Sequence, residues 1–258
     1  MRHHLHKFSQ AFALVGAIVP LRLHAQAHEG AHWAYKGKEG PSHWGALDSA
    51  YALCARGKAQ SPINIVPTAP HQLPGLSIAY QPTAINILNN GHTIQVNYDS
   101  GSFILVEQTR YQLLQFHFHE PSEHTITGKG APAELHLVHR SADGHLAVIG
   151  VLLQSGTANP AFATLWAHLP AAEGPVQHID AQINAADLIP AKHGTYRYDG
   201  SLTTPPCSES VKWLVMASPV MLSAEQLTAL RAALPPDNRP VQPLNHRKVA
   251  DDVRPGQE

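Results

Sequence analysis

The segment Gln115–His124, QFHFHEPSEH, places two histidines one residue apart within a run that has the composition of a β-strand. Side chains alternate between the two faces of a strand, so His117 and His119 point to one face and Phe116 and Phe118 to the other. Two histidines on one face of a rigid strand provide half of a metal site. A third histidine would complete a ligand set that leaves one coordination position of zinc open to water.

The third histidine is expected in the run AELHLVH at residues 133–139. Glu134, His136 and Val138 share one face of this strand, and His136 meets the HxH pair if the two strands are neighbours. A single strand histidine is more often a core or surface residue than a ligand. An HxH pair followed by a histidine in an ExH context is much more specific for a metal site.

Polar side chains beside the three histidines are placed to support the rings. Gln115 shares the face of His117 and His119, and Glu134 shares the face of His136. An amide oxygen or a carboxylate that accepts the second ring N–H fixes the tautomer of a metal-binding histidine. Ordinary strand positions are the alternative for both residues, although a buried glutamate without a partner would be costly.

The composition favours one large, mainly β domain. The 258 residues are 43% hydrophobic and 14% charged, and 21 prolines and 18 glycines separate short apolar runs. Tight-turn sequences such as Asn89-Asn90-Gly91 and Asp143-Gly144 predict a largely antiparallel sheet. The expected strands cover residues 84–88, 93–98, 103–110, 111–119, 133–139 and 147–154. Two peripheral helices are expected, over 159–168 and 223–234, because each begins at an N-cap residue and ends before proline.

The first 27 residues have the three parts of an export signal. Arg2 and Lys7 precede an apolar run over 11–21, and Ala25-Gln26-Ala27 provides a small-residue cleavage site. A membrane anchor is the alternative, but the run is shorter than the roughly 20 residues that a span needs. We therefore expect residues 1–27 to be removed on secretion.

The remaining chain, residues 28–258, is expected to be a single soluble domain. Removal of the signal leaves 15 basic and 19 acidic residues, a net charge of −4. This balance does not recruit nucleic acid or an anionic membrane. No second apolar run approaches the length of a membrane span. The chain could form a homo-oligomer, although no isolated apolar stripe marks an interface.

Export also bears on Cys54 and Cys207, the only two cysteines. In an oxidising compartment two cysteines form a disulfide more often than they remain free buried thiols. The bridge would close a loop of about 150 positions, for which chain-entropy arguments give on the order of 5 kcal/mol.

Six ordered motifs resemble those of the α-class carbonic anhydrases. They are QSPINI (60–65), FHFH (116–119), SEHT (122–125), AELHLVH (133–139), SLTTPP (201–206) and RPVQPLNHR (239–247). The resemblance runs from about Trp33 to Arg247, which is nearly the whole mature chain. The signal, the cysteine pair and the short FHFHEPSEH connection are similar to exported bacterial members, which implies a periplasmic location. The implied fold is a single domain around a large twisted, mostly antiparallel sheet of about ten strands with short peripheral helices.

The resemblance implies a Zn2+ enzyme that interconverts CO2 with bicarbonate and a proton. The zinc ligands would be His117, His119 and His136. The first ring would be supported by Gln115, the second by the backbone carbonyl of Asn238 and the third by Glu134. Zinc lowers the pKa of its bound water to about 7, so that hydroxide is available to attack CO2 at neutral pH.

The resemblance assigns an orienting role to Thr203, which would accept the hydrogen bond of the hydroxide and donate its own to Glu123. A threonine whose donor is committed to a carboxylate can only accept from the zinc-bound oxygen. Without the rest of the pattern, Thr203 would be interpreted as a turn residue before two prolines. Cys207 lies four residues further on, so a bridge to Cys54 would tether this loop. The family also implies cis peptide bonds before Pro62 and Pro206.

A small substrate pocket and a proton path complete the implied site. Nonpolar CO2 would rest against a mostly apolar wall beside the metal, although each wall residue could equally be plain core. The pocket residues are Val138, Val148, Leu202, Thr204 and Trp213. His92 matches the shuttle position, because a histidine of pKa about 6.5 exchanges protons near neutrality. Its alternative is a solvated histidine after a turn. Tyr35 and Asn90 would line the water path.

The alternative function is an exported zinc-binding or interaction protein on the same scaffold. Family relatives that have lost zinc ligands serve in interaction, and a chain with 19 histidines could buffer zinc. The intact ligand set, together with Glu123, Thr203 and His92, argues against a degenerate member. Zinc buffering would not need a threonine paired with a carboxylate.

Overall fold

The computed structural model describes residues 30–67 and 73–252. The export signal expected over residues 1–27 lies outside this part of the chain. The described residues from Ala31 onward form one compact unit, which contains every helix and strand described. None of the helices in the described ranges is long and apolar enough to cross a membrane.

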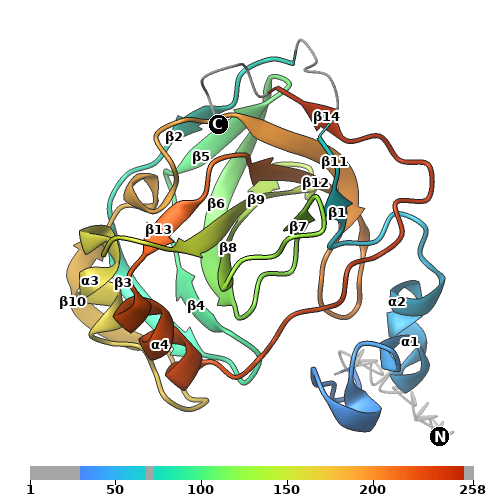
Figure 1. Ribbon diagram of the computed structural model, residues 1–258, viewed down its shortest axis with the longest axis horizontal. Helices are drawn as coiled ribbons and strands as arrows, with labels where there is room; N and C mark the ends of the chain where they lie inside the picture. Colours follow the sequence, from blue (N-terminus) through green and yellow to red (C-terminus); the bar gives the residue numbers. More distant parts are fainter. Residues whose placement is uncertain (1–29, 68–72, 253–258) are drawn as a thin grey trace, which may run out of the picture. The chain divides into compact units, whose positions relative to one another are not determined.

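A twelve-stranded sheet dominates the described chain (Figure 1). Its strands are β2 (Ser77–Ala79), β3 (Thr83–Asn89), β4 (Ile94–Asn97), β5 (Phe103–Val106), β6 (Thr109–His119), β8 (Ala133–Ser141), β9 (Leu146–Ser155), β10 (Gln177–Ile183), β11 (Thr195–Ser201), β12 (Glu209–Met216), β13 (Val220–Leu222) and β14 (Ala250–Asp251). The main order is β10-β3-β4-β6-β8-β9-β12-β11-β14, and β13 pairs with β9 while β2 joins β6 through β5. Most neighbours are antiparallel, but β9 is parallel to both β12 and β13. The expected mainly β fold with a large, mostly antiparallel sheet is confirmed.

The strand expected over 103–110 was wrong in its extent, because the chain turns inside it. β5 ends at Val106, and Glu107 and Gln108 both have positive φ, 50° and 68°. Two successive residues of positive φ make the tight turn whose twist suits an antiparallel hairpin. Neither residue is glycine or asparagine, so the usual sequence signal for this turn was missing.

Short helices lie at the margins of the sheet. They are α1 (Trp44–Leu47), α2 (Leu53–Arg56), α3 (Ala163–Trp166) and α4 (Ala224–Ala233), with 3-10 turns η1 (Gly37–Glu39), η2 (Ser49–Tyr51), η3 (Pro160–Phe162) and η4 (Ala185–Leu188). The two expected helices are present as η3 with α3 and as α4. Ser223 and Gln226 form the capping box of α4. α1 and α2 were not predicted from the sequence.

A bulge in β6 decides which side chains face the core. The register against β8 shifts between Leu113 and Gln115, so one extra residue separates the two halves of β6. Tyr111 and Leu113 before the bulge and the phenylalanines after it therefore share one face, whereas simple alternation would have put Leu113 with the histidines. Gln115 and the HxH pair project from the opposite face.

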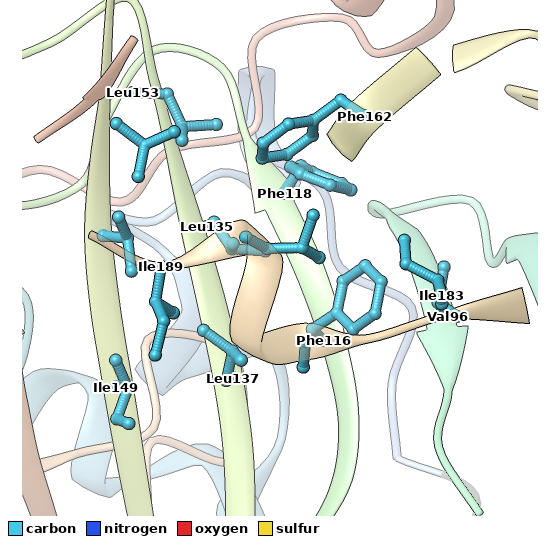
Figure 2. Close-up of a cluster of buried hydrophobic side chains, with 14 of the residues drawn as sticks. Val96, Phe116, Phe118, Leu135, Leu137, Ile149, Leu153, Phe162, Ile183 and Ile189 are labelled. Atoms are coloured by element: carbon cyan, nitrogen blue, oxygen red, sulfur yellow. The ribbon is translucent and has the colours of Figure 1, made fainter. Parts of the chain in front are cut away.

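The main core covers the phenylalanine face of the sheet. Phe116 and Phe118 pack there with Leu135 and Leu137 of β8 and with Phe162 of η3 (Figure 2). All five side chains are fully buried. A second cluster on the other face contains Val148, Tyr198 and Trp213 among its members. His117 and His119 therefore project from a strand whose opposite face is held in place by close-packed apolar side chains.

Candidate metal centre

Three histidines from two neighbouring strands converge in the described structure. His117 and His119 lie on β6, and His136 lies on β8, directly opposite His117 in the antiparallel register. The candidate ligand atoms of the three rings all lie within 4.8 Å of one another. His119 and His136 are each 1% exposed, while His117 is only half-buried. The half-buried ring therefore marks the open side of the group.

One nitrogen of each ring is bound to a group outside the cluster. His117 Nδ1 pairs with Gln115 Oε1 at 2.8 Å, and His136 Nε2 pairs with Glu134 Oε1 at 2.8 Å. Oxygen acceptors at these nitrogens require the rings to donate there. The lone pairs of neutral rings then lie on His117 Nε2 and His136 Nδ1, which is the tautomer choice that metal binding needs.

The support of His119 differs from the expectation by one residue. Its Nδ1 pairs at 3.1 Å with the backbone carbonyl of Asp237, not with that of Asn238. Asp237 is held in place because its N–H donates to the Glu120 carbonyl and its Oδ1 accepts from the Glu120 N–H. These two bonds join Asp237 to the residue after His119 and direct its carbonyl at the ring. Asn238 is only half-buried and has no such anchor in the hydrogen bonds of the described residues.

The residues fit a metal ion. His119 Nε2 is buried and has no hydrogen-bond partner among residues 30–67 and 73–252. Burial and its histidine neighbours lower the pKa of His117, and burial lowers that of His136 to about 4 although Glu134 opposes the shift. Burial would also lower the pKa of His119, but the carboxylates of Glu123 and Asp237 raise it to about 10. Two neutral rings and two nearby carboxylates favour a cation at this point.

A second group of potential ligands, His124, Glu134 and His136, does not compete with the first. Glu134 Oε1 already accepts from His124 Nδ1 at 2.7 Å and from His136 at 2.8 Å, and Oε2 accepts two backbone N–H groups. His124 Nε2 pairs with the Tyr198 hydroxyl at 2.6 Å. These bonds occupy the polar atoms of His124 and Glu134, so the group is a support for His136.

Glu123 and Thr203 meet beside the centre. Glu123 is 2% exposed, and its Oε1 accepts the Arg239 backbone N–H at 2.8 Å. Its Oε2 lies 3.6 Å from His119 Nε2 and has no partner at full hydrogen-bond geometry among the described residues. Burial raises the pKa of Glu123, while His119, the Arg239 N–H and the nearby Thr203 hydroxyl lower it. Thr203 itself is 5% exposed.

The residues expected to hold CO2 lie together on the histidine side of the sheet. Val148 and Trp213 are each 2% exposed in the second core cluster, and Val138 and Leu202 pack against it. The Trp213 ring lies 4.9 Å from that of His136, centroid to centroid. The structure thus places an apolar surface next to one of the three histidines. Thr204 lines the cavity described next.

A cavity of about 140 Å³ leads away from the histidines. His117 and His119 line it together with residues expected in the substrate and proton paths, namely Tyr35, Asn90, His92 and Thr204. His92 is half-buried and stacks on Trp33, with ring centroids 3.7 Å apart and an angle of 7° between the planes. Trp33 was not singled out from the sequence, because an aromatic residue near the N-terminus carries no signal for this contact.

The disulfide expected from the sequence is present between Cys54 and Cys207, which are 153 residues apart. The Cys207 N–H donates to the Thr204 carbonyl at 2.8 Å, and the Leu202 N–H donates to Ser208 at 3.0 Å. The bridge therefore lies in the same short loop as Thr203. Cis peptide bonds precede Pro62 and Pro206, as expected, and a third precedes Pro121.

Comparison with known proteins agrees with this geometry. The sequence model of the eukaryotic-type carbonic anhydrase family matches residues 39–253. The carbonic anhydrase of Nostoc sp. is 45% identical over 230 residues, which cover 86% of each chain. That of Pectobacterium atrosepticum is 45% identical over 226 residues, covering 87% of this chain and 93% of its own.

The fold is likewise similar to that of solved carbonic anhydrases. The α-carbonic anhydrase of Thermovibrio ammonificans, solved with the inhibitor sulfanilamide, has a TM-score of 0.84 and 45% identity and covers 86% of this chain and 99% of its own. An enzyme from a hydrothermal vent chimney has a TM-score of 0.81 and 48% identity, with coverage of 85% and 99%. The sequence match, the shared fold and the converging histidines together place the chain in the α-carbonic anhydrase family, whose characteristic activity is the hydration of CO2.

Proposed function

We propose that the chain is a zinc carbonic anhydrase that interconverts CO2 with bicarbonate and a proton. The observation that carries the proposal is the convergence of His117 Nε2, His119 Nε2 and His136 Nδ1, each on a ring whose other nitrogen is engaged. Three imidazole nitrogens with an open fourth position are the ligand set of catalytic zinc sites. Zinc, when bound, lowers the pKa of a water molecule to about 7 and so supplies an oxygen nucleophile at neutral pH.

Thr203 orients the nucleophile in this proposal. Its hydroxyl donates toward Glu123, so only its lone pairs remain for a hydrogen bond with the attacking oxygen. Glu123 is suited to accept, because the Arg239 N–H occupies one of its oxygens and leaves the other open. The pair thus fixes the direction of attack without exchanging a proton with the substrate.

The proposed CO2 site is the surface formed by Val138, Val148, Leu202 and Trp213, with Thr204 at its polar margin. CO2 has no strong hydrogen-bonding group, so an apolar surface beside the nucleophile holds it near without fixing it tightly. Release of charged bicarbonate from such a surface is favourable for the same reason.

His92 is the proposed proton shuttle. It lines the cavity that also contains His117 and His119, and Tyr35 and Asn90 line the same space. The Asn90 side chain accepts the His92 and Thr93 N–H groups at 3.0 and 2.9 Å, which fixes the turn that carries the shuttle. A proton leaving the nucleophilic water can pass along water in this cavity to the ring and from there to buffer.

Export to the periplasm completes the proposal, with residues 1–27 as a cleaved signal and 28–258 as one catalytic domain. Two observations support it. The Cys54–Cys207 disulfide requires an oxidising compartment to persist. Bacterial carbonic anhydrases are among the relatives of 45% identity.

The test combines metal analysis with stopped-flow CO2 hydration. Purified protein should contain one equivalent of zinc, and chelation should abolish hydration that added Zn2+ restores. His136→Ala should lose both the metal and the rate. His145→Ala, in an exposed residue away from the centre, is the matched control and should lose neither. Metal binding without any hydration that depends on His136 would refute catalysis and favour the zinc-binding or interaction protein.

A further inference from the structure

His92 lines two cavities. The inner cavity, about 140 Å³, is also lined by His117 and His119. The outer cavity, about 460 Å³, is lined by His92 and its stacking partner Trp33 but by none of the three histidines of the metal centre. A proton that reaches His92 from the inner cavity can therefore leave through the outer one.

Glu173 is the acidic side chain held beside this exit. A Cβ added to Gly91, the residue before His92, would lie 2.9 Å from Glu173 Oε2. The loop that carries Glu173 is tied to the shuttle turn, because the Gly174 N–H donates to the Asn89 carbonyl at 3.0 Å and Asn89 Nδ2 donates to Pro170 at 3.4 Å. These backbone contacts fix the loop, so the carboxylate starts from a backbone position beside the shuttle turn.

The carboxylate of Glu173 is also uncommitted. It makes no hydrogen bond and no ion pair within residues 30–67 and 73–252, and the residue is exposed. The other titratable groups that line the outer cavity are His32, Tyr35, Lys36 and Asp237. Asp237 is 2% exposed and engaged with His119 and Glu120, so its charge is directed to the metal centre.

The neighbours of His92 shift the pKa of its ring in opposite directions. Burial lowers the pKa of the ring and so does His32, whose ring centroid is 6.5 Å away, while Glu173 raises it. A shuttle works best when its pKa is near that of the donor and the working pH. Without an acidic neighbour, the imidazolium of a half-buried ring beside a second histidine would form less readily.

We propose that Glu173 is a positioning residue for proton export, whose carboxylate stabilises protonated His92 on the side of the outer cavity. The inference rests on the proposed shuttle role of His92. The ring gains one proton from water in the inner cavity and gives one proton to a buffer base in the outer cavity, so it returns to the neutral form. Glu173 itself never carries the transferred proton.

The experiment uses the zinc-loaded protein with Glu173→Gln and Glu173→Lys. NMR titration of the His92 ring, assigned by its loss in His92→Ala, should show a lower pKa in Glu173→Gln and a still lower one in Glu173→Lys. Turnover in weak buffer should fall about two- to fivefold, the scale of one exposed charge pair. External imidazole should restore turnover. The value of kcat/KM should be unchanged, because the hydration of CO2 does not involve the outer cavity.

Two variants control for general effects of charge. Asp180→Asn removes a negative charge from the exposed face of β10 and should change neither the His92 pKa nor turnover. Glu173→Asp keeps the charge and should retain most of the wild-type values. A purely structural role for Glu173 would not produce this charge dependence.

Two results would overturn the proposal, and they can be told apart. If His92→Ala lowers turnover but both Glu173 variants keep the wild-type His92 pKa and turnover, the shuttle stands and the role of Glu173 is refuted. If His92→Ala leaves turnover in weak buffer unchanged, the shuttle role is refuted and the role of Glu173 with it.

Discussion

The backbone N–H of Arg239 donates a 2.8 Å hydrogen bond to Oε1 of Glu123, which orients the carboxylate beside the histidines. The guanidinium of the same residue is 1% exposed and binds Gln60 Oε1, the Ser61 carbonyl and the Cys54 carbonyl at 2.8 to 3.0 Å. Arg239 therefore connects the disulfide segment, through its side chain, to the Glu123 carboxylate, through its backbone N–H. Its pKa is lowered to about 10, chiefly by burial, so it remains charged at neutral pH.

Replacement of Arg239 by methionine should be strongly destabilising. The methionine keeps most of the volume but leaves three buried acceptors without a donor, and the loss of a buried hydrogen-bonded charge costs about 3 kcal/mol or more. Urea unfolding of the zinc-loaded protein measures the effect. Lys212→Met, which breaks an exposed contact of 3.1 Å with Glu107, is the control and should cost about 1 kcal/mol or less. Equal losses in the two variants would contradict the role given to Arg239.

The disulfide should contribute to both stability and activity. Closing a loop of 153 residues stabilises the fold by about 5 kcal/mol in the chain-entropy account. Because Cys207 lies in the loop of Thr203, the double variant Cys54→Ser, Cys207→Ser should also lower CO2 hydration under conditions where it remains folded. Unfolding curves and stopped-flow rates measure the two effects separately. Unchanged stability and rate after removal of the bridge would refute the tethering hypothesis.

His92→Ala should lower the turnover limit and leave kcat/KM largely intact. The proton would then have to leave the inner cavity without a titratable ring, so its export becomes rate-limiting in weak buffer. External imidazole should restore part of the rate, because it can occupy the space of the missing ring. The measurement is stopped-flow hydration at several buffer concentrations, and the prediction fails if the variant matches the wild type in weak buffer.

His139 should make the fold sensitive to acid. Burial lowers the pKa of this ring to about 3, against two backbone hydrogen bonds that raise it, and its Nε2 pairs with the Tyr80 hydroxyl at 2.8 Å. The folded pKa lies below the unfolded value of 6.5, so the unfolded chain takes up the proton first as the pH falls. The contribution of the neutral His139 ring to the free energy of unfolding is complete above about pH 6.5. It is lost toward pH 3, at about 1.4 kcal/mol for each pH unit.

The double variant Tyr80→Phe, His139→Leu isolates this contribution. It removes both members of the buried pair, so neither is left without a partner. Its free energy of unfolding should depend on pH less steeply than that of the wild type between about pH 6 and pH 4. Parallel curves in that range would show that His139 does not contribute.

The local features that the sequence could predict are those set by neighbouring residues. The alternation of Phe116, His117, Phe118 and His119 predicted which of them share a face of the strand, because side-chain direction in a strand depends only on local geometry. The same rule placed Gln115 and Glu134 beside the rings that they contact. The capping box at Ser223 likewise marked the start of α4, since both of its hydrogen bonds lie within one turn.

The features that could not be predicted depend on contacts between distant segments. The backbone carbonyl that pairs with His119 Nδ1 belongs to Asp237, because Asp237 is bonded to Glu120, 117 residues away. No local signal in the sequence distinguishes Asp237 from Asn238 for this role. The turn at Glu107 and Gln108 and the bulge after Leu113 were missed, because register is chosen by the pairing of whole strands. Glu173 carried no signal at all until its loop was found against Gly91.

The sequence by itself determined the three histidines, their strand faces and the family to which the chain belongs, since these follow from residue type and spacing. Only the tertiary structure decided that the rings converge, which carbonyl holds His119, and how Arg239 joins the disulfide segment to Glu123. The physical reason is that hydrogen bonds and register between strands are satisfied across the whole sheet at once. A residue's partner then depends on where every other strand has paired.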